Sequence, residues 1–210
     1  MTEKLISSVA KYYTNRIEEF GATAKGVDWN GVESQTVRFQ QLSKIIESDV
    51  LVDEVFKIAD LGCGYGAYYD FLKSEFGHQF DYFGYDVSSK MCDAARSNIG
   101  RGRAQITCSK EIDNDVDYAV ASGIFNVRLE EKADEWQDYF YQTISGMFRR
   151  ADRGISFNCL TSFSDEDRMK DYLFYADPCE VFKFCKNELS KEVALIHDYG
   201  LYEFTILVRK

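Results

Sequence analysis

The feature that most constrains this chain is a glycine-rich turn at residues 60–66, Asp-Leu-Gly-Cys-Gly-Tyr-Gly, between an apolar run and a helical pattern. Gly62, Gly64 and Gly66 stand at alternate positions. Glycine tolerates positive φ angles there and lets a bound molecule approach the backbone closely. The helix that follows presents free N–H groups at its first turn, which favour an anionic group of a ligand. These residues predict a buried strand, a ligand-binding loop and a helix in succession.

A second acidic residue follows at a characteristic distance. The short apolar stretch 82–85 ends in Asp86, which is 20 residues after Gly66 (86 − 66 = 20). A carboxylate at the end of such a strand accepts hydrogen bonds from the two hydroxyls of a ribose. We therefore expect a cofactor that contains a nucleoside.

Two kinds of nucleoside cofactor fit this layout. Gly62, Gly64 and Ala67 match the pattern G-x-G-x-x-G/A, so an NAD(P)-binding oxidoreductase is one alternative. Asp60, two residues before Gly62, favours the other kind. An anion at this position would face the pyrophosphate of a dinucleotide, whereas it would attract a cofactor with ammonium and sulfonium groups.

Length and charge restrict the partners. The chain has 210 residues, 45% of them apolar, which predicts one globular domain with a sizeable core. The net charge of 25 − 35 = −10 repels phosphate backbones, so we expect no nucleic-acid partner. No apolar run approaches 18 residues, so we expect no membrane partner.

Cysteine use points to a reducing compartment. The six cysteines form no C-x-x-C pair and no Cys/His metal spacing, so we expect neither disulfides nor a metal. The sequence predicts a cytoplasmic protein that is a monomer or a homodimer.

Strands and helices are expected to alternate after residue 50. We expect strands at about 55–60, 80–85, 104–108, 116–121, 154–158, 193–197 and 204–208. We expect helices at about 3–20, 34–48, 66–76, 88–98, 129–149 and 178–189. The alternation is typical of a parallel sheet with helices on both faces. The last two strands are joined by a connection too short for a crossover, so they should be antiparallel.

The two motifs together resemble a known family. D-L-G-C-G-Y-G resembles motif I of the class I S-adenosylmethionine (SAM) methyltransferases, and G-Y-D-V-S at 84–88 resembles their second motif. G-V-D-W-N, S-Q-T-V-R-F, A-S-G-I-F-N-V and H-D-Y resemble segments of a group of small bacterial methyltransferases. The resemblance implies a three-layer Rossmann-like α/β fold with seven strands, mostly parallel with an antiparallel C-terminal strand. It also implies an N-terminal helical lid over 1–49, part of the same domain as a methyltransferase core over 50–210.

The resemblance also implies where the cofactor binds. Asp60 should hold the amino end of SAM, the glycine loop its methionine part, and Asp86 its ribose, although Asp86 could instead cap the next helix. Arg38 could pair with the cofactor carboxylate or lie exposed on its helix. The expected cofactor-binding residues are Asp60, Gly62, Cys63, Gly64, Gly66, Asp86, Val87, Met91, Glu111, Ser122 and Arg38.

The methyl acceptor is expected to be a small molecule, methylated at a hydroxyl oxygen. Such an acceptor needs a base, and His197 is the candidate, with a strand-end histidine as the alternative. The expected substrate-binding residues are Tyr12, Tyr13, Trp29, Gln35, Asn126 and Tyr199, although aromatic residues at helical spacing also suit a core. A SAM-binding module without turnover is a further alternative.

Overall fold

The computed structural model describes residues 3–29, 31–46, 55–100 and 102–210. Its centre is a seven-stranded sheet with the strand order β3-β2-β1-β4-β5-β7-β6. Neighbours among β1 to β5 run parallel, whereas β7 is antiparallel to both β5 and β6. The predicted fold class is confirmed, including the antiparallel pairing of the last two strands.

The strands lie close to their predicted positions. They are β1 Phe56–Leu61, β2 Phe80–Asp86, β3 Ala104–Cys108, β4 Val116–Ala121, β5 Ala151–Leu160, β6 Glu192–Ile196 and β7 Glu203–Arg209. Strand β5 is longer than expected because it pairs on both sides, with β4 from Ala151 and with β7 as far as Leu160. Backbone hydrogen bonds to two neighbouring strands therefore hold β5 over its whole length.

The helices also follow the sequence pattern. They are α1 Glu3–Phe20, α2 Val32–Ser43, α3 Ala67–Phe76, α4 Ser89–Ile99, α5 Ala133–Arg150 and α6 Pro178–Phe184, with short helices η1 Ala24–Val27, η3 Glu166–Arg168 and η4 Cys185–Leu189. The last residues of the helix predicted at 34–48 lie outside the described residues. Prediction placed α5 four residues too early, because Leu129 adopts a positive φ of 56° in a turn. The Arg128 side chain holds that turn by donating to the carbonyl oxygens of Glu131 and Leu173.

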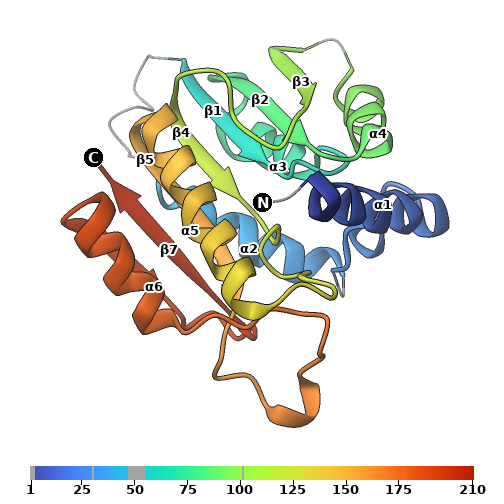
Figure 1. Ribbon diagram of the computed structural model, residues 1–210. Coiled ribbons are helices and arrows are strands. Elements are labelled where there is room, and N and C mark those ends of the chain that lie inside the picture. The colour runs from blue at the N-terminus through green and yellow to red at the C-terminus, as the bar shows by residue number, and fades with distance from the viewer. Residues whose placement is uncertain (1–2, 30, 47–54, 101) are drawn as a thin grey trace.

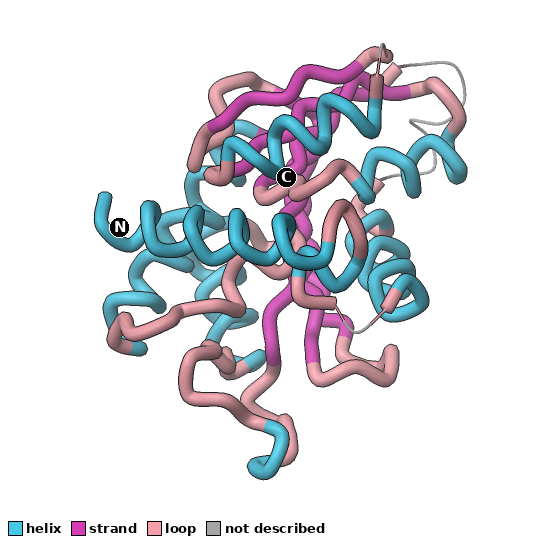
Figure 2. Tube along the Cα trace, turned by 90° about the vertical axis from the view of Figure 1, so that its right-hand side faces the viewer, coloured by secondary structure: helices cyan, strands magenta, loops and turns pink. Residues whose placement is uncertain are grey.

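Helices cover both faces of the sheet (Figure 1). Helices α5 and α6 pack on one face, where Trp136, Phe140 and Ile144 of α5 are buried at helical spacing. Helices α2 and α3 pack on the other face through Leu42 and Leu72. Figure 2, turned by 90°, shows the strands between the two helical layers. The core is therefore divided into two apolar clusters by the sheet.

The connection from β3 to β4 contains no helix. Residues 109–115 cross the face of the sheet as an irregular segment, with Ile112 buried at 7% exposure. The hydroxyl of Tyr85 donates to Asp113 (2.7 Å) and accepts from Asn114 (2.8 Å), which fixes the segment on β2. This segment brings residues 109 and 110 to the carboxyl ends of the strands.

The first 46 residues have two different roles. Helix α1 and η1 lie beside the carboxyl ends of β1 and β2, and Thr14 of α1 is hydrogen-bonded to Ser88 at the start of α4 (2.8 Å). Helix α2 belongs to the sheet layer instead, since Ser156 of β5 donates to the Leu42 carbonyl oxygen (2.9 Å). The proposed boundary between 49 and 50 lies outside the described residues. Among the described residues of this segment, α1 and η1 lie over the strand ends and α2 packs on the sheet, and the lid itself stays a prediction.

Candidate active site

A cavity of about 100 Å³ opens at the carboxyl ends of β1, β2 and β4. Its floor is formed by the glycine loop and its roof by α1 and η1, which contribute Val9, Tyr13 and Val27. Strand ends and helix starts meet at this edge of the sheet, which is where ligands bind in open α/β folds.

The glycine loop requires its glycines. Gly62 has a φ of +80°, and a Cβ atom there would lie 2.0 Å from a methyl carbon of Ile124. The N–H groups of Gly62 and Cys63 both donate to the Tyr85 carbonyl oxygen, at 2.7 and 2.9 Å. Strand β2 therefore holds the loop, and the predicted loop residues Gly62, Cys63 and Gly64 all line the cavity. Gly66 has a φ of +86° and is the N-cap of α3.

Asp86 joins the two loops. One carboxylate oxygen accepts from the Gly64 N–H (3.0 Å) and the other from the Ser88 N–H (2.8 Å). The N-cap of α4 is Ser88, so Asp86 does not have the capping role that was its alternative. Burial raises the pKa of Asp86 to about 6, although the two N–H groups oppose this rise. A carboxylate oxygen has two lone pairs, so both oxygens can accept from a ligand as well.

Asp60 is buried at the end of β1 and lines the same cavity. It accepts a hydrogen bond from the Tyr82 hydroxyl at 2.6 Å. Burial raises the pKa of Asp60 to about 7, and the nearby Asp86 charge adds to this rise. A buried carboxyl with few partners gains most from a cationic ligand, because the ligand's charge offsets the loss of water.

The wall beside Asp86 differs from its prediction at one position. Val87 and Met91 line the cavity as expected. Glu111 does not: it is exposed, forms an ion pair with Lys110 (3.4 Å) and lines an outer groove. Ser109 and Lys110 take its place in the cavity. The expected contact is thus displaced by one or two residues, because the Ser109 side chain bonds the Glu111 N–H and turns the chain.

Ser122 follows β4 and lines the cavity. Its hydroxyl oxygen is buried and has no hydrogen-bond partner within the described ranges 3–29, 31–46, 55–100 and 102–210. An unsatisfied buried hydroxyl costs free energy, so a ligand that bonds it is favoured. Ser122 therefore remains a residue for contact with a bound molecule.

Three of the predicted substrate residues lie together. Tyr13, Trp29 and Gln35 line the cavity from the roof and from α2. The other three are engaged elsewhere. Tyr12 donates to Asp28 (2.5 Å), Asn126 accepts from the Leu160 N–H (3.2 Å), and Tyr199 is hydrogen-bonded to Thr205 (3.1 Å). None of these three is in the cavity lining.

Arg38 has a different partner from the expected one. Its Nε and Nη2 donate to the two carboxylate oxygens of Glu203, at 2.8 and 2.7 Å, and its Nη1 donates to the Ser34 carbonyl oxygen. Arg38 is 6% exposed and lies outside the cavity lining. The partner of Arg38 is therefore Glu203 and not the expected cofactor carboxylate. The sequence analysis did not single out Glu203.

His197 is also displaced from its predicted role. It is exposed after β6, and its ring centroid is 6.1 Å from those of both Phe163 and Phe204. It does not line the cavity. The prediction assumed that the end of β6 reaches the active site, but β7 and β5 separate β6 from β4 in the sheet. His197 therefore has the alternative role of a strand-end histidine.

Sequence analysis missed several aromatic residues of the cavity, among them Tyr65, Tyr68 and Tyr139. Tyr65 donates to Gln35 (3.1 Å), which joins α2 to the glycine loop. Tyr65 could have been found from its position within the glycine motif. Tyr139 could not, because its spacing on α5 is that of a core residue.

Comparison with known proteins places the chain in a class. Residues 58–142 match the family model described as "Methyltransferase domain". A protein of Mycobacterium tuberculosis (strain ATCC 25618 / H37Rv), named "Putative methyltransferase Rv1506c", is 54% identical over 156 residues. That match covers 74% of this chain and 93% of the relative. With this fold and these loops, the chain belongs to the class I SAM-dependent methyltransferases.

Solved structures agree on the fold. Magnesium protoporphyrin IX methyltransferase from Synechocystis PCC 6803, with bound SAM, matches with a TM-score of 0.64 at 14% identity. The match covers 98% of this chain and 97% of that one. Human N-acetylserotonin methyltransferase in complex with SAM matches with a TM-score of 0.57 at 14% identity, covering 100% and 67%. The family match and the 54% identical relative, rather than these structures, set aside the oxidoreductase alternative.

The described residues lack two further kinds of feature. They contain no group of three or more His, Cys, Asp and Glu side chains that could hold a metal ion. Nor does that part of the chain contain a helix of the length and apolar character needed to cross a bilayer.

Proposed function

We propose that this protein transfers the methyl group of SAM to an oxygen atom of a small-molecule acceptor. The observation that carries this proposal is a roofed cavity with two kinds of wall. Asp60, Asp86 and the glycine loop form one wall, and Tyr13, Trp29 and Gln35 form the other. The first wall suits the cofactor and the second suits the acceptor.

The cofactor wall fits SAM residue by residue. When bound, SAM supplies an electrophilic methyl group on a sulfonium ion. Asp86 would accept hydrogen bonds from the ribose hydroxyls, and Asp60 would attract the amino group. Val87 and Met91 would pack against the adenine, and the glycine loop would lie along the methionine part. The unsatisfied hydroxyl of Ser122 supports a ligand contact at the end of β4.

Alignment and exclusion of water are the protein's main contributions to methyl transfer. Helix α1 supports both, because Thr14 fixes it to Ser88 and Tyr12 fixes it to Asp28 of the roof. Arg16 adds an ion pair with Asp28 at 2.6 Å. A roof that is joined internally by Asp28 and fixed to α4 through Thr14 and Ser88 would keep water from the methyl group and hold the acceptor in line.

The cavity chemistry favours an acceptor oxygen that ionises easily. Neither histidine of the chain lines the cavity. Tyr13 reaches it, but burial raises the pKa of this phenol well above its usual value, so it is a poor base. Asp60 and Asp86 are assigned to the cofactor. A carboxylic acid, whose oxygen is already ionised at neutral pH, and a phenol, whose hydroxyl is far more acidic than that of an alcohol, are therefore better acceptors than an aliphatic alcohol.

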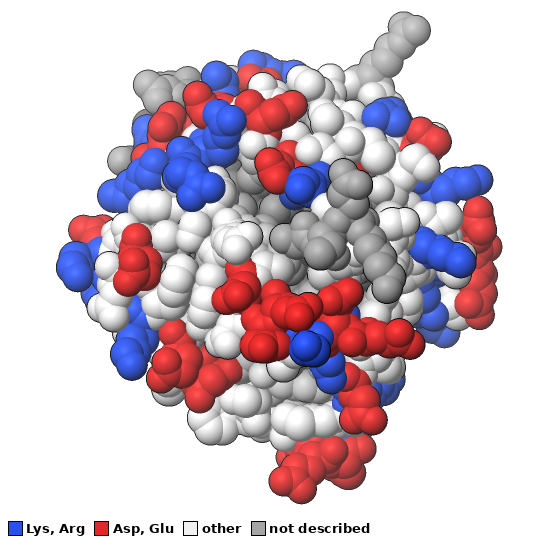
Figure 3. Space-filling view, viewed as in Figure 1, with Lys and Arg blue, Asp and Glu red and all other residues white. Residues whose placement is uncertain are grey.

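A small acceptor also suits the surface. The roof limits access to the cavity, and the net charge is −10. Acidic side chains form a band just below the centre of the face in Figure 3 and smaller groups beneath it, whereas many of the basic ones gather at its upper left. A polyanion such as RNA would be repelled by such a face.

The test begins with thermal unfolding in the presence of SAM, S-adenosylhomocysteine (SAH), NAD and NADP. Ligands that bind only the folded state raise its stability by about 2.7 kcal/mol at 100 times the dissociation constant. We expect stabilisation by SAM and SAH alone. SAH release is then measured with SAM and panels of phenols, carboxylic acids, aliphatic alcohols and RNA. Turnover with RNA alone would overturn the acceptor proposal, and binding of SAH without turnover on any panel would favour a non-catalytic module.

A further inference from the structure

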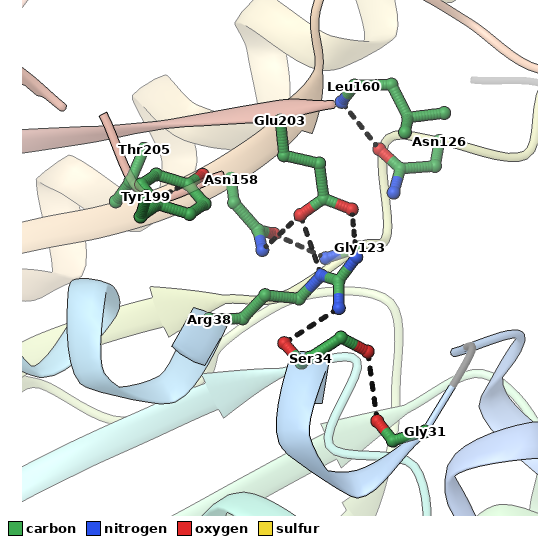
Figure 4. Close-up of polar contacts among 10 residues, drawn as sticks. All are labelled: Gly31, Ser34, Arg38, Gly123, Asn126, Asn158, Leu160, Tyr199, Glu203 and Thr205. Atoms are coloured by element: carbon green, nitrogen blue, oxygen red, sulfur yellow. Dashed lines mark hydrogen bonds and ion pairs between the residues drawn. The ribbon is translucent and has the colours of Figure 1, made fainter. Parts of the chain in front are cut away.

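A closed ring of contacts stands behind the acceptor wall, and Figure 4 shows the part of it formed by Arg38, Glu203, Asn158 and Gly123. It runs from Glu203 to Arg38, to Trp29, to Gly123, to Asn158 and back to Glu203. These residues come from β7, α2, the turn after η1, the turn after β4, and β5. Parts of the chain up to 174 residues apart (203 − 29 = 174) are thus joined at one place.

Glu203 is the junction of the ring. Its Oε2 accepts from Arg38 Nε (2.8 Å) and from Asn158 Nδ2 (3.1 Å), and its Oε1 accepts from Arg38 Nη2 (2.7 Å). Glu203 is 1% exposed and Asn158 is fully buried. The carboxylate therefore fixes two side chains that point away from it in different directions.

Each of these side chains supports a different part of the cavity lining. The Arg38 guanidinium carbon lies 3.9 Å from the ring centroid of Trp29, a cation–π contact. Asn158 Oδ1 accepts from the Gly123 N–H (2.8 Å) and so holds the turn that carries Ser122. Trp29 closes the ring, because a Cβ atom on Gly123 would lie 2.4 Å from its Cη2.

We propose that Glu203 is a positioning residue for methyl transfer, which through Arg38 fixes Trp29 of the acceptor wall and through Asn158 fixes the Ser122–Gly123 turn beside Trp29. The inference rests on the proposed function, because that assigns Trp29 to the acceptor wall. Glu203 itself lies outside the cavity lining.

Stability alone does not account for such a pair. A buried ion pair loses the hydration of both charges, and apolar residues of similar volume are often as stabilising. The side chains of the Arg38–Glu203 pair are 8% and 1% exposed. This pair fixes the orientation of the guanidinium, which apolar residues could not do. The planar guanidinium packs on a ring face while its N–H groups are held by one carboxylate.

The test measures the mobility of Trp29 in the protein without cofactor. The chain has two tryptophans, and Trp136 is 1% exposed. The fluorescence of a Trp29→Phe variant therefore comes from Trp136 alone, and subtracting it from the fluorescence of the wild type leaves that of Trp29. We expect Glu203→Gln to raise the acrylamide quenching of Trp29 about fivefold, since a lost charged hydrogen bond increases local opening by about that factor. The SAH dissociation constant should change by less than about threefold, because the hydrogen-bond partners of Asp60 and Asp86 are Tyr82, Gly64 and Ser88, none of which belongs to the ring.

Two further variants separate positioning from stability. Arg38→Met/Glu203→Leu removes both charges, so it should fold near the wild-type unfolding temperature yet leave Trp29 open to acrylamide. Glu192→Gln makes the same change at an exposed position on β6 and should leave quenching unchanged. Wild-type quenching in the folded double variant would overturn the proposal. Since no ligand is present, this result stands even where SAH fails to bind, an outcome that would instead count against the proposed function.

Discussion

The two walls of the cavity are built in different ways. The cofactor wall comes from two short segments, 60–66 and 86–91, that follow adjacent parallel strands. Its key contacts join the ends of these two neighbouring strands, such as the hydrogen bond from the Gly64 N–H to Asp86. The acceptor wall is formed by residues of α1, the turn after η1 and α2, and it is fixed from behind by β7. The residues of a wall built from two sequence motifs can be predicted from the sequence. The residues of a wall assembled from distant segments cannot be predicted in this way.

The largest expected effect tests the cofactor wall. Asp86→Ala should weaken SAH binding by about 10- to 100-fold, the loss of one to two charged hydrogen bonds and of the support for the glycine loop. Isothermal titration measures the change. Asp81→Ala is the matched control, because Asp81 lies on the same strand in an exposed ion pair with Arg103. Equal affinity in Asp86→Ala and wild type would remove Asp86 from the cofactor site.

A second effect concerns pH. With a pKa of about 7 for Asp60, its ionised fraction rises about tenfold between pH 6 and pH 8. SAH affinity should rise in parallel, because the ligand's amino group needs the carboxylate, and Asp60→Asn should flatten this dependence. A pH profile that is the same in both proteins would contradict the assignment of Asp60.

The same group affects stability without ligand. Its folded-state pKa lies above the ordinary value of 3.8, so between about pH 4 and 7 the folded state holds a proton that the unfolded chain has lost. Asp60 therefore destabilises the folded protein increasingly as pH rises through this window. The Asp60→Asn variant should lose less stability than wild type over the same range, as measured by denaturant unfolding.

A substitution at the acceptor wall is expected to have a smaller effect on the affinity for SAH. Gly123→Ala would place a methyl group against Trp29 at a φ of +75°, so stability should fall by about 2–4 kcal/mol while SAH affinity changes little. Gly200→Ala is the control, because Gly200 has a similar φ of +71° and nothing within 4 Å of an added Cβ. The difference between the two losses isolates the contact with Trp29. A large loss of SAH affinity in Gly123→Ala would show that the two walls are not separate.

The smallest effect is expected at Glu111. Its carboxylate is exposed and bonds only to Lys110 in the described part of the chain, so Glu111→Ala should leave SAH affinity within a factor of about two. Titration of this variant beside wild type checks the point. A tenfold loss would restore Glu111 as an adenine contact and contradict the position of the 109–115 segment.

The sequence alone determined the strands, most helices and which loop residues line the cavity. Alternating apolar segments, three glycines and two acids at strand ends are local signals, because backbone conformation and close approach depend on neighbouring residues. Tyr13, Trp29 and Gln35 were expected to bind the substrate, from a resemblance and not from spacing; all three line the cavity, and their binding role stays a prediction.

Only the tertiary structure decided which polar groups meet. Arg38 binds Glu203 across 165 residues, and no periodicity predicts the partner of a buried charge. A glutamate at the start of an apolar strand signals that a partner is needed, since an unpaired buried carboxylate is too costly. The sequence does not identify the cationic side chain that pairs with this carboxylate. The expected position of His197 at the active site was wrong for the same reason. The strand order that separates β6 from the cavity is a property of the assembled sheet.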